Sequence, residues 1–311
     1  MIIMNYTLHQ LEVFLKIAEL QSVTKASEAL YLTQPAVSIQ LKKFQEQFKI
    51  PLFEVVGRRI YITEFGLEVA AAASKIMEEV KAIDYKALSY QGELAGKLKI
   101  AIVSTAKYVM PYFISDFINE NRGIDLVMKV TNKASVIKAL ENNEVDFAMV
   151  STIPKKLKIN RIELMPNQLY MVGGKDYKLK NAYLSKSEFQ NLPLIFREQG
   201  SATRLAMEKF IESKKIPTYK KMELMSNEAL KQAVISGLGF SIMPLIGIKN
   251  AITYGDLQII PVKGLPIVTN WNLIWLSSKN MTTIAKSLIN YINEHKDDII
   301  NKHFSWLDQY K

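Results

Sequence analysis

The chain has 311 residues, of which 49% are hydrophobic and 23% are charged, a composition typical of a globular protein with two or three folding units. No apolar run reaches the roughly 18 residues of a membrane-spanning helix, residues 1–10 lack the basic start of a signal peptide, and the absence of cysteine excludes disulfides and thiolate metal sites. We therefore expect a cytoplasmic protein without a membrane partner. The net charge of +10 does not by itself indicate DNA binding, because residues 1–92 hold ten basic and ten acidic side chains.

Three short helices are expected at the start of the chain. The first begins after Thr7, because Thr7 and Gln10 have the spacing of a capping box. A second follows Ser22. A third follows Thr33 and carries Pro35 in its first turn, where a backbone N–H is not needed. A tight connection between the second and third helices is the pattern of a helix-turn-helix.

The third helix has two different faces. Its buried stripe is expected to be Val37, Leu41, Phe44 and Phe48. On the opposite face, Gln34 can pair with adenine, Ile39 can pack on a thymine methyl group, and lysines can bind phosphate. A solvated amphipathic helix is the alternative for any single helix of this kind. The candidate DNA contacts on this helix are Thr33, Gln34, Pro35, Ser38, Ile39, Lys42 and Lys43.

Residues 52–63 contain two β-prone runs around a Gly-Arg turn, which predicts a hairpin. Arg58 and Arg59 at its tip could reach a neighbouring minor groove or the DNA backbone. A solvated tip explains these arginines equally well in isolation. Combined with the preceding helices, the hairpin favours a winged helix-turn-helix DNA-binding domain over residues 1–65.

A long helix without proline is expected over residues 66–92. Its apolar positions follow a heptad pattern, which predicts that two helices pack on each other. We favour homodimerisation through this linker helix, since paired DNA half-sites need two binding domains. A partner helix within the same chain is the alternative. The expected seam is Val69, Ala73, Ile76, Val80, Ile83, Ala87 and Tyr90.

Residues 5–65 resemble the N-terminal domain of LysR-type transcriptional regulators in two stretches, SVTKASEALYLTQPAVSIQLKKF and PLFEVVGRRIYITEFG. The family pattern places Thr33, Gln34, Pro35, Ser38 and Gln40 on the recognition helix, and Arg58, Arg59 and Thr63 in the wing. The resemblance implies homodimers or homotetramers on promoter DNA, with RNA polymerase as a further candidate partner.

From residue 93 onward, predicted strands and helices alternate, which indicates α/β units with ligands at the carboxyl ends of the strands. We expect two lobes, with lobe I at residues 93–165 and 266–311 and lobe II at residues 166–265. Two α/β lobes joined by paired crossings resemble periplasmic binding proteins, an arrangement that the effector domain of LysR-type regulators shares.

Polar residues cluster in four segments where these strands end. Hydroxyls, helix N-termini and nearby cations are the groups that hold a small anion, although each Ser, Thr or Asn could also be a simple helix cap. Arg197 and Arg204 are the side chains expected to face a carboxylate or phosphate. The candidate effector contacts are Ser104, Thr105, Lys107, Thr131, Asn132, Arg197, Ser201, Thr203, Arg204 and Asn227.

The C-terminal segments, among them FREQGSATRLAMEKF and MSNEALKQAVISGLGF, resemble the LysR-type branch that controls Calvin-cycle (RuBisCO) operons. The expected function is therefore a DNA-binding regulator modulated by a small anionic metabolite in the interlobe cleft. A ligand-independent repressor remains an alternative. An α/β enzyme with an accessory helical domain is a weaker one, because P-loop, GxGxxG and GxSxG patterns are missing and His9, His295 and His303 have no metal spacing. No cofactor is expected.

Overall fold

The computed structural model describes residues 5–57, 59–179, 181–217 and 221–310. The chain forms two compact units that divide between Glu93 and Leu94, one residue from the division expected at residues 92 and 93. Within the described ranges, no helix has both the length and the apolar character that crossing a bilayer requires. Each unit is described separately below.

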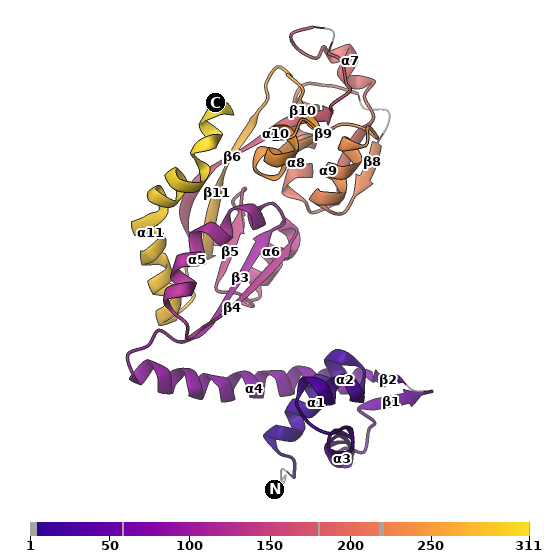
Figure 1. The fold of residues 1–311 in the computed structure, drawn as a ribbon, viewed down its shortest axis with the longest axis vertical. Coiled ribbons are helices and arrows are strands. Elements are labelled where there is room, and N and C mark those ends of the chain that lie inside the picture. Colours follow the sequence, from indigo (N-terminus) through magenta and orange to yellow (C-terminus); the bar gives the residue numbers. More distant parts are fainter. Residues whose placement is uncertain (1–4, 58, 180, 218–220, 311) are drawn as a thin grey trace. The chain divides into compact units, whose positions relative to one another are not determined.

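The first unit contains the expected three helices, hairpin and long helix (Figure 1). Thr7 caps the first helix as predicted: its N–H donates to Gln10 Oε1 at 2.9 Å, and the Gln10 N–H donates back to Thr7 Oγ1 at 3.3 Å. Pro35 lies in the first turn of the third helix. The elements are α1 (Leu8–Leu20), α2 (Val23–Ala29), α3 (Gln34–Gln45), β1 (Phe53–Val56), β2 (Arg59–Ile62) and α4 (Glu64–Tyr90).

The core of this unit forms where α1, α3 and the start of α4 pack together. The fully buried rings of Phe14 and Phe44 lie 5.2 Å apart between centroids. Gly66 allows close packing at the start of α4, since a Cβ there would lie 2.0 Å from the Leu52 carbonyl oxygen. Because α4 contributes to this core, the domain boundary expected after residue 65 does not separate two compact parts.

The heptad seam of α4 is used in two different ways. Val69 and Ala73 pack against the core of their own unit. Farther along, Ile76, Ile83 and Tyr90 are 40%, 65% and 95% exposed. The seam therefore splits into a part that anchors the helix and an apolar part that this single chain leaves uncovered.

The second unit contains a seven-stranded mixed sheet with the strand order β10-β6-β11-β5-β3-β4, in which β9 pairs with β6 off this path, and a separate parallel pair, β7 and β8. In lobe I, β3 pairs in parallel with both β4 and β5. The lobe I elements are β3 (Gly96–Val103), the 3-10 helix η1 (Ala106–Tyr108), α5 (Met110–Glu120), β4 (Ile124–Thr131), α6 (Lys133–Glu141), β5 (Phe147–Val150) and α11 (Thr283–Phe304).

The two crossings between the lobes are the antiparallel strands β6 (Ile159–Gly174) and β11 (Ile267–Leu276). Both pass through the lobes without a break, so the lobe boundary expected between residues 165 and 166 falls inside β6. Lobe II adds α7 (Lys186–Gln190), β7 (Leu194–Arg197), α8 (Ala202–Ser213), β8 (Lys221–Leu224), α9 (Asn227–Ile235), β9 (Ser241–Pro244), α10 (Leu245–Thr253) and β10 (Leu257–Ile259).

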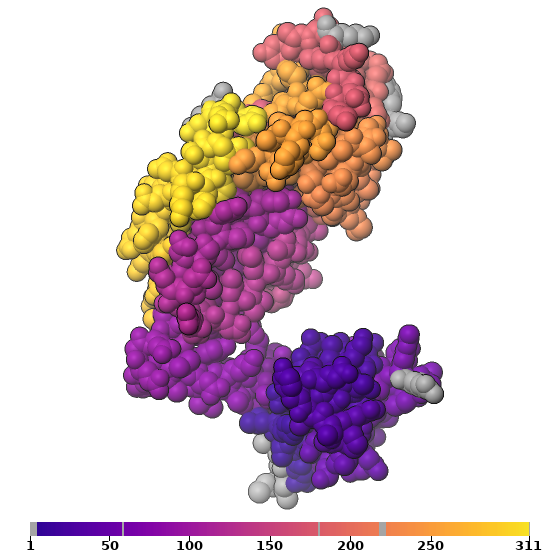
Figure 2. All heavy atoms as spheres, in the orientation of Figure 1, coloured from indigo at the N-terminus to yellow at the C-terminus, as the bar shows by residue number. Residues whose placement is uncertain are grey.

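The C-terminal segment contacts both lobes. The last helix continues to Phe304 and leads into a 3-10 helix η2 (Ser305–Tyr310). Leu307 packs against the apolar cores of both lobes, and the Tyr170 hydroxyl donates to the Tyr310 carbonyl at 2.5 Å. Figure 2 shows this segment, in yellow, lying against both the magenta and the orange parts of the unit. It thus ties the two lobes together.

Candidate functional site

The exposed face of α3 is the face predicted from helical rotation. Val37 and Phe44 are fully buried and Leu41 is 4% exposed, which confirms three members of the expected core stripe. The fourth, Phe48, lies past the end of α3 and packs partly buried against the same core. Ile39 is 53% exposed on the other side. The exposed residues include every candidate DNA contact of this helix: Thr33, Gln34, Pro35, Ser38, Ile39, Lys42 and Lys43.

The side chains on this face have few partners within the unit. Thr33 Oγ1 accepts the Ala36 N–H at 3.4 Å and caps the helix. In the described part of the chain, no hydrogen bond or ion pair engages the side chains of Gln34, Ser38, Lys42 or Lys43. This face of the helix presents polar groups and one isoleucine to the outside. It can therefore bind a partner whose surface offers both hydrogen-bonding and apolar groups.

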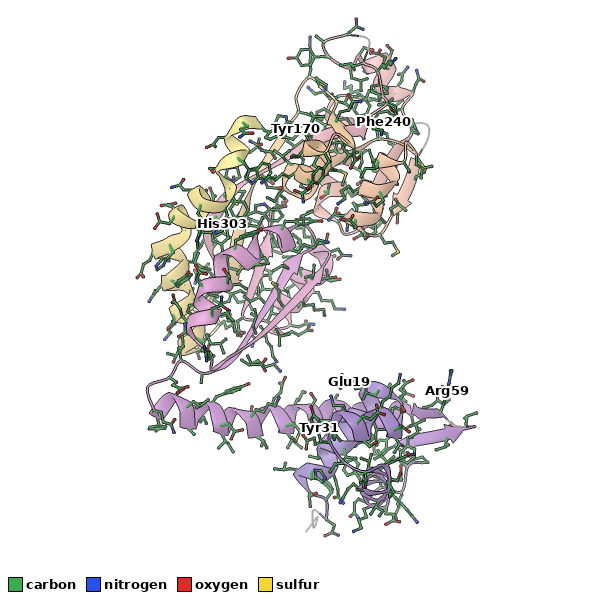
Figure 3. The ribbon with its side chains drawn as sticks, viewed as in Figure 1. Glu19, Tyr31, Arg59, Tyr170, Phe240 and His303 are labelled. Atoms are coloured by element: carbon green, nitrogen blue, oxygen red, sulfur yellow. The ribbon has the colours of Figure 1, made fainter. Side chains whose placement is uncertain are left out.

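The predicted hairpin is present, with Phe53 paired to Ile62 and Val56 to Arg59. Gly57 has φ +64°, which the turn requires and which favours glycine. Arg59 is exposed and projects from the hairpin (Figure 3). Arg58 lies outside the described residues. Sequence reasoning missed the exposed apolar side chains of Val55 and Val56, which are 62% and 63% exposed.

In the second unit, three candidate effector residues meet at one hydroxyl. Ser104, which follows β3 in lobe I, accepts hydrogen bonds from two lobe II side chains through its Oγ. Arg197 Nη1 donates at 3.3 Å and Asn227 Nδ2 donates at 2.6 Å. Arg197 and Asn227 are only 3% and 6% exposed. We call Ser104, Arg197 and Asn227 the cleft cluster.

Arg197 is also held by Glu198, a residue that no sequence pattern singled out. Arg197 Nε and Nη2 donate to the two carboxylate oxygens of Glu198 at 2.8 and 3.0 Å, and the two side chains are only 3% and 11% exposed. A bidentate pair of this kind fixes the plane of the guanidinium. The arginine therefore meets Ser104 of the other lobe in one defined orientation.

Arg204, the other candidate arginine, is paired with carboxylates of its own lobe. Its Nε donates to Glu208 at 2.7 Å and its Nη1 donates to Glu223 at 2.5 Å. These two carboxylates raise the pKa of Arg204 above its ordinary value. Nη1 also donates to the Arg197 carbonyl oxygen at 2.9 Å. Its charge is compensated within the lobe, and the side chain supports the loop that carries Arg197.

The other candidate residues surround the cleft cluster or lie apart from it. Asn132 caps α6 by accepting the Ser135 N–H at 3.0 Å, and Ser201 caps α8. Beside them the lobes touch, because the Ala134 N–H donates to the Gly200 carbonyl at 3.3 Å. Thr105 is buried, and Thr131 and Thr203 are half-buried. Lys107 instead lines a separate pocket with Tyr108.

Lys133, the first residue of α6, was not among the candidates. Burial lowers its pKa, and the positive charge of Lys209 lowers it further. Lys209 belongs to α8 of the other lobe. Two ammonium groups that repel each other across the lobes are a feature that only tertiary structure reveals.

Two family descriptions match the chain: "Bacterial regulatory helix-turn-helix protein, lysR family" over residues 8–67, and "LysR substrate binding domain" over residues 91–297. The transcriptional activator CmpR of Synechocystis is 35% identical over 95% of this chain and 97% of its own length. A RuBisCO operon transcriptional regulator of Acidithiobacillus ferrooxidans is 32% identical, over 94% of this chain and 95% of its own. The regulatory domain of Synechocystis CcmR in complex with 2-PG is 28% identical, with a TM-score of 0.62 over 65% of this chain and 98% of that domain.

Proposed function

Because the chain belongs to the LysR family of bacterial transcriptional regulators, we propose that α3 reads promoter DNA and that the cleft cluster binds a small anionic effector. The chain is a regulator and not an enzyme. Its place of action is then the cytoplasm, where promoter DNA is found.

The exposed face of α3 supports the DNA-binding part of the proposal. Gln34 and Ser38 offer hydrogen-bonding groups and Ile39 an apolar surface, which suits base edges in a major groove. Lys42, Lys43 and Arg59 supply charge for phosphates. Two chains would pair through the uncovered part of the α4 seam, and a dimer of such dimers would give the homotetramer.

The contact between the lobes at Ser104 carries the effector part of the proposal. Ser104 comes from lobe I, and Arg197 and Asn227 come from lobe II, so a ligand held by all three would bind both lobes at once. Arginine, hydroxyl and amide donors together favour a carboxylate or phosphate. The complex of CcmR with 2-PG makes 2-PG the first probe to test.

A ligand in the cleft would act by preferring one arrangement of the lobes. It can shift the regulator only as far as its affinities for the two arrangements differ. RNA polymerase would respond to that shift through the promoter complex. Since two relatives are named as RuBisCO operon regulators, carbon-fixation promoters are the first targets to examine.

Calorimetric titration of the full chain with 2-PG tests this proposal. Ser104→Ala removes the hydroxyl on which the cluster converges and should weaken 2-PG binding by about tenfold or more, since a hydrogen bond to a charged group contributes about 1.5–3 kcal/mol. Ser115→Ala is the matched control, because Ser115 is exposed on α5 of the same lobe and, among the described residues, its hydroxyl bonds only to its neighbour Asp116.

Both variants should bind operator DNA as the unaltered chain does. Equal affinity of the two variants for 2-PG would contradict the assignment of the cleft. A chain that binds its operator but responds to no small anion would be a ligand-independent repressor.

A further inference from the structure

The pocket that Lys107 lines in the C-terminal unit combines positive charge with aromatic surfaces. Its volume is about 410 Å³, and its walls come from η1 and α5 of lobe I, α9 and α10 of lobe II, and the C-terminal segment. Figure 3 labels His303 in this region, on the face of α11 near α5. We call it the basic-aromatic pocket and define it by Lys107, Tyr108, Lys231, Lys249, His303 and Trp306.

Its lining is rich in basic side chains. Among the described residues, the lining holds three lysines and a histidine but no aspartate or glutamate. Lys231 pairs with Glu228 at 2.9 Å, and the positive charge of Lys107 also acts on Glu228 and helps to lower its pKa. No ion pair engages Lys249 in the described ranges. Two ammonium groups in one concave site attract an anion, and lysine is a common binder of phosphate.

The aromatic rings of the pocket are held in place by packing. Lys249 Nζ lies 4.4 Å from the centroid of the Trp306 ring, and Lys107 Nζ lies 5.0 Å from that of Tyr108. Tyr108 packs so closely on α10 that a Cβ at Gly247 would lie 3.3 Å from its ring. The ammonium groups of Lys107 and Lys249 therefore each lie beside a partly exposed aromatic ring.

We propose that the basic-aromatic pocket binds a mononucleotide, with the phosphate between Lys107 and Lys249 and the base against Trp306. Lys249 Nζ lies over the Trp306 ring at 4.4 Å from its centroid, so its side chain turns from the ring to the phosphate when the base stacks. Stacking of a base on an aromatic side chain is favourable for every base, because each has a π-face. The volume lies within the roughly 300–1,000 Å³ typical of small-molecule sites. This site is separate from the cleft cluster, since Ser104, Arg197 and Asn227 are not among its lining residues.

The test titrates the full chain with AMP and follows tryptophan fluorescence. Of the three tryptophans, Trp271 is fully buried and Trp275 is 9% exposed, so quenching by AMP should come mainly from Trp306. Lys107→Gln combined with Lys249→Gln should weaken AMP binding at least tenfold. Lys286→Gln, an exposed lysine of α11, is the matched control and should leave binding unchanged.

Trp306→Leu should lower AMP affinity about fivefold or more, in line with the loss of one stacked base. Adenosine, which has the ring without the charge, and inorganic phosphate, which has the charge without the ring, should each bind more weakly than AMP. Unfolding midpoints of all variants show whether any loss of binding reflects loss of the fold, and calorimetry measures AMP binding in the Trp306 variant.

Three results would each overturn the proposal: AMP that does not bind at millimolar concentration, AMP that binds the double lysine variant as tightly as the control, or AMP that 2-PG displaces by direct competition. Ser104→Ala should leave AMP binding intact. Failure of 2-PG binding with retained AMP binding would therefore count against the cleft assignment and not against this pocket.

Discussion

Removing Arg197 should destabilise the C-terminal unit strongly, because Glu198 would be left as a buried carboxylate without its partner. The two side chains are 3% and 11% exposed and share two hydrogen bonds of 2.8 and 3.0 Å. Deleting one partner of such a pair costs about 3–5 kcal/mol, whereas replacing both by apolar groups of similar volume is often nearly neutral. We therefore expect Arg197→Met to be more harmful than Arg197→Met combined with Glu198→Met.

Denaturant unfolding of the full chain measures this difference. All three tryptophans lie in the C-terminal unit, at positions 271, 275 and 306, so their fluorescence follows that unit alone. The single Arg197→Met variant should lose about 3–5 kcal/mol of unfolding free energy. In the double variant, the loss of unfolding free energy should fall to about 1 kcal/mol. The coupling energy between the two positions is then well above the error of a double-mutant cycle.

The cycle is completed by Glu198→Met alone. If the losses of the two single variants simply add in the double variant, the view that Arg197 and Glu198 stabilise each other is refuted. The result also decides how Arg197 variants can be used. If the coupling is large, a loss of effector response in Arg197→Ala reflects instability as well as lost ligand contact, and Ser104→Ala is the better probe of the cleft.

Three further predictions concern other parts of the chain. Phe44→Ala should lower the stability of the first unit by about 3–5 kcal/mol, whereas Ile39→Ala should leave it nearly unchanged; hydrogen exchange of α1 and α3 measures both, and equal losses would contradict the assignment of faces. Gln34→Ala should cost about 1–3 kcal/mol on the cognate operator and relax preference at one base pair. The exposed Gln47, two residues past the end of α3, provides the control, and an equal loss on random DNA would rule out base reading. Lys133→Met should raise the free energy of unfolding at neutral pH, because burial and a neighbouring ammonium lower the native pKa of Lys133 and so disfavour its charged form. As pH rises through that lowered pKa, the native chain loses this proton before the unfolded chain does, native stability increases, and the advantage of Lys133→Met should shrink; an advantage that grows instead would contradict the sign.

Local patterns predicted the elements whose structure depends on near neighbours. The caps at Thr7 and Thr33 and the core stripe of α3 follow from spacing along one helix, and all three are present. The split of the α4 seam could not be predicted in this way. Whether Ala73 faces its own unit or a second chain depends on how α4 crosses α1, which is a tertiary property.

Side-chain pairing was the main feature that the sequence left open. Arg197 and Arg204 look alike as cations near strand ends, yet one reaches the cleft cluster and the other is neutralised by Glu208 and Glu223. Glu223 lies nineteen residues from Arg204, a separation at which no helical or strand periodicity applies. The basic-aromatic pocket was missed for the same reason, because its walls come from segments far apart in the chain.

The bonds of Arg197 also limit how a cleft ligand can work. Nε and Nη2 donate to Glu198 and Nη1 donates to Ser104, so an anion that takes over any of these donors gains one charged hydrogen bond and breaks another. The net binding energy is then the small difference between two similar interactions. Such an exchange favours a ligand of moderate affinity and high selectivity. Only an anion that also contacts Ser104 and Asn227 recovers the free energy of the hydrogen bond that Glu198 loses. Ligand binding would then be coupled to the arrangement of the lobes. The reason is that one of the exchanged hydrogen bonds, from Arg197 to Ser104, joins lobe II to lobe I.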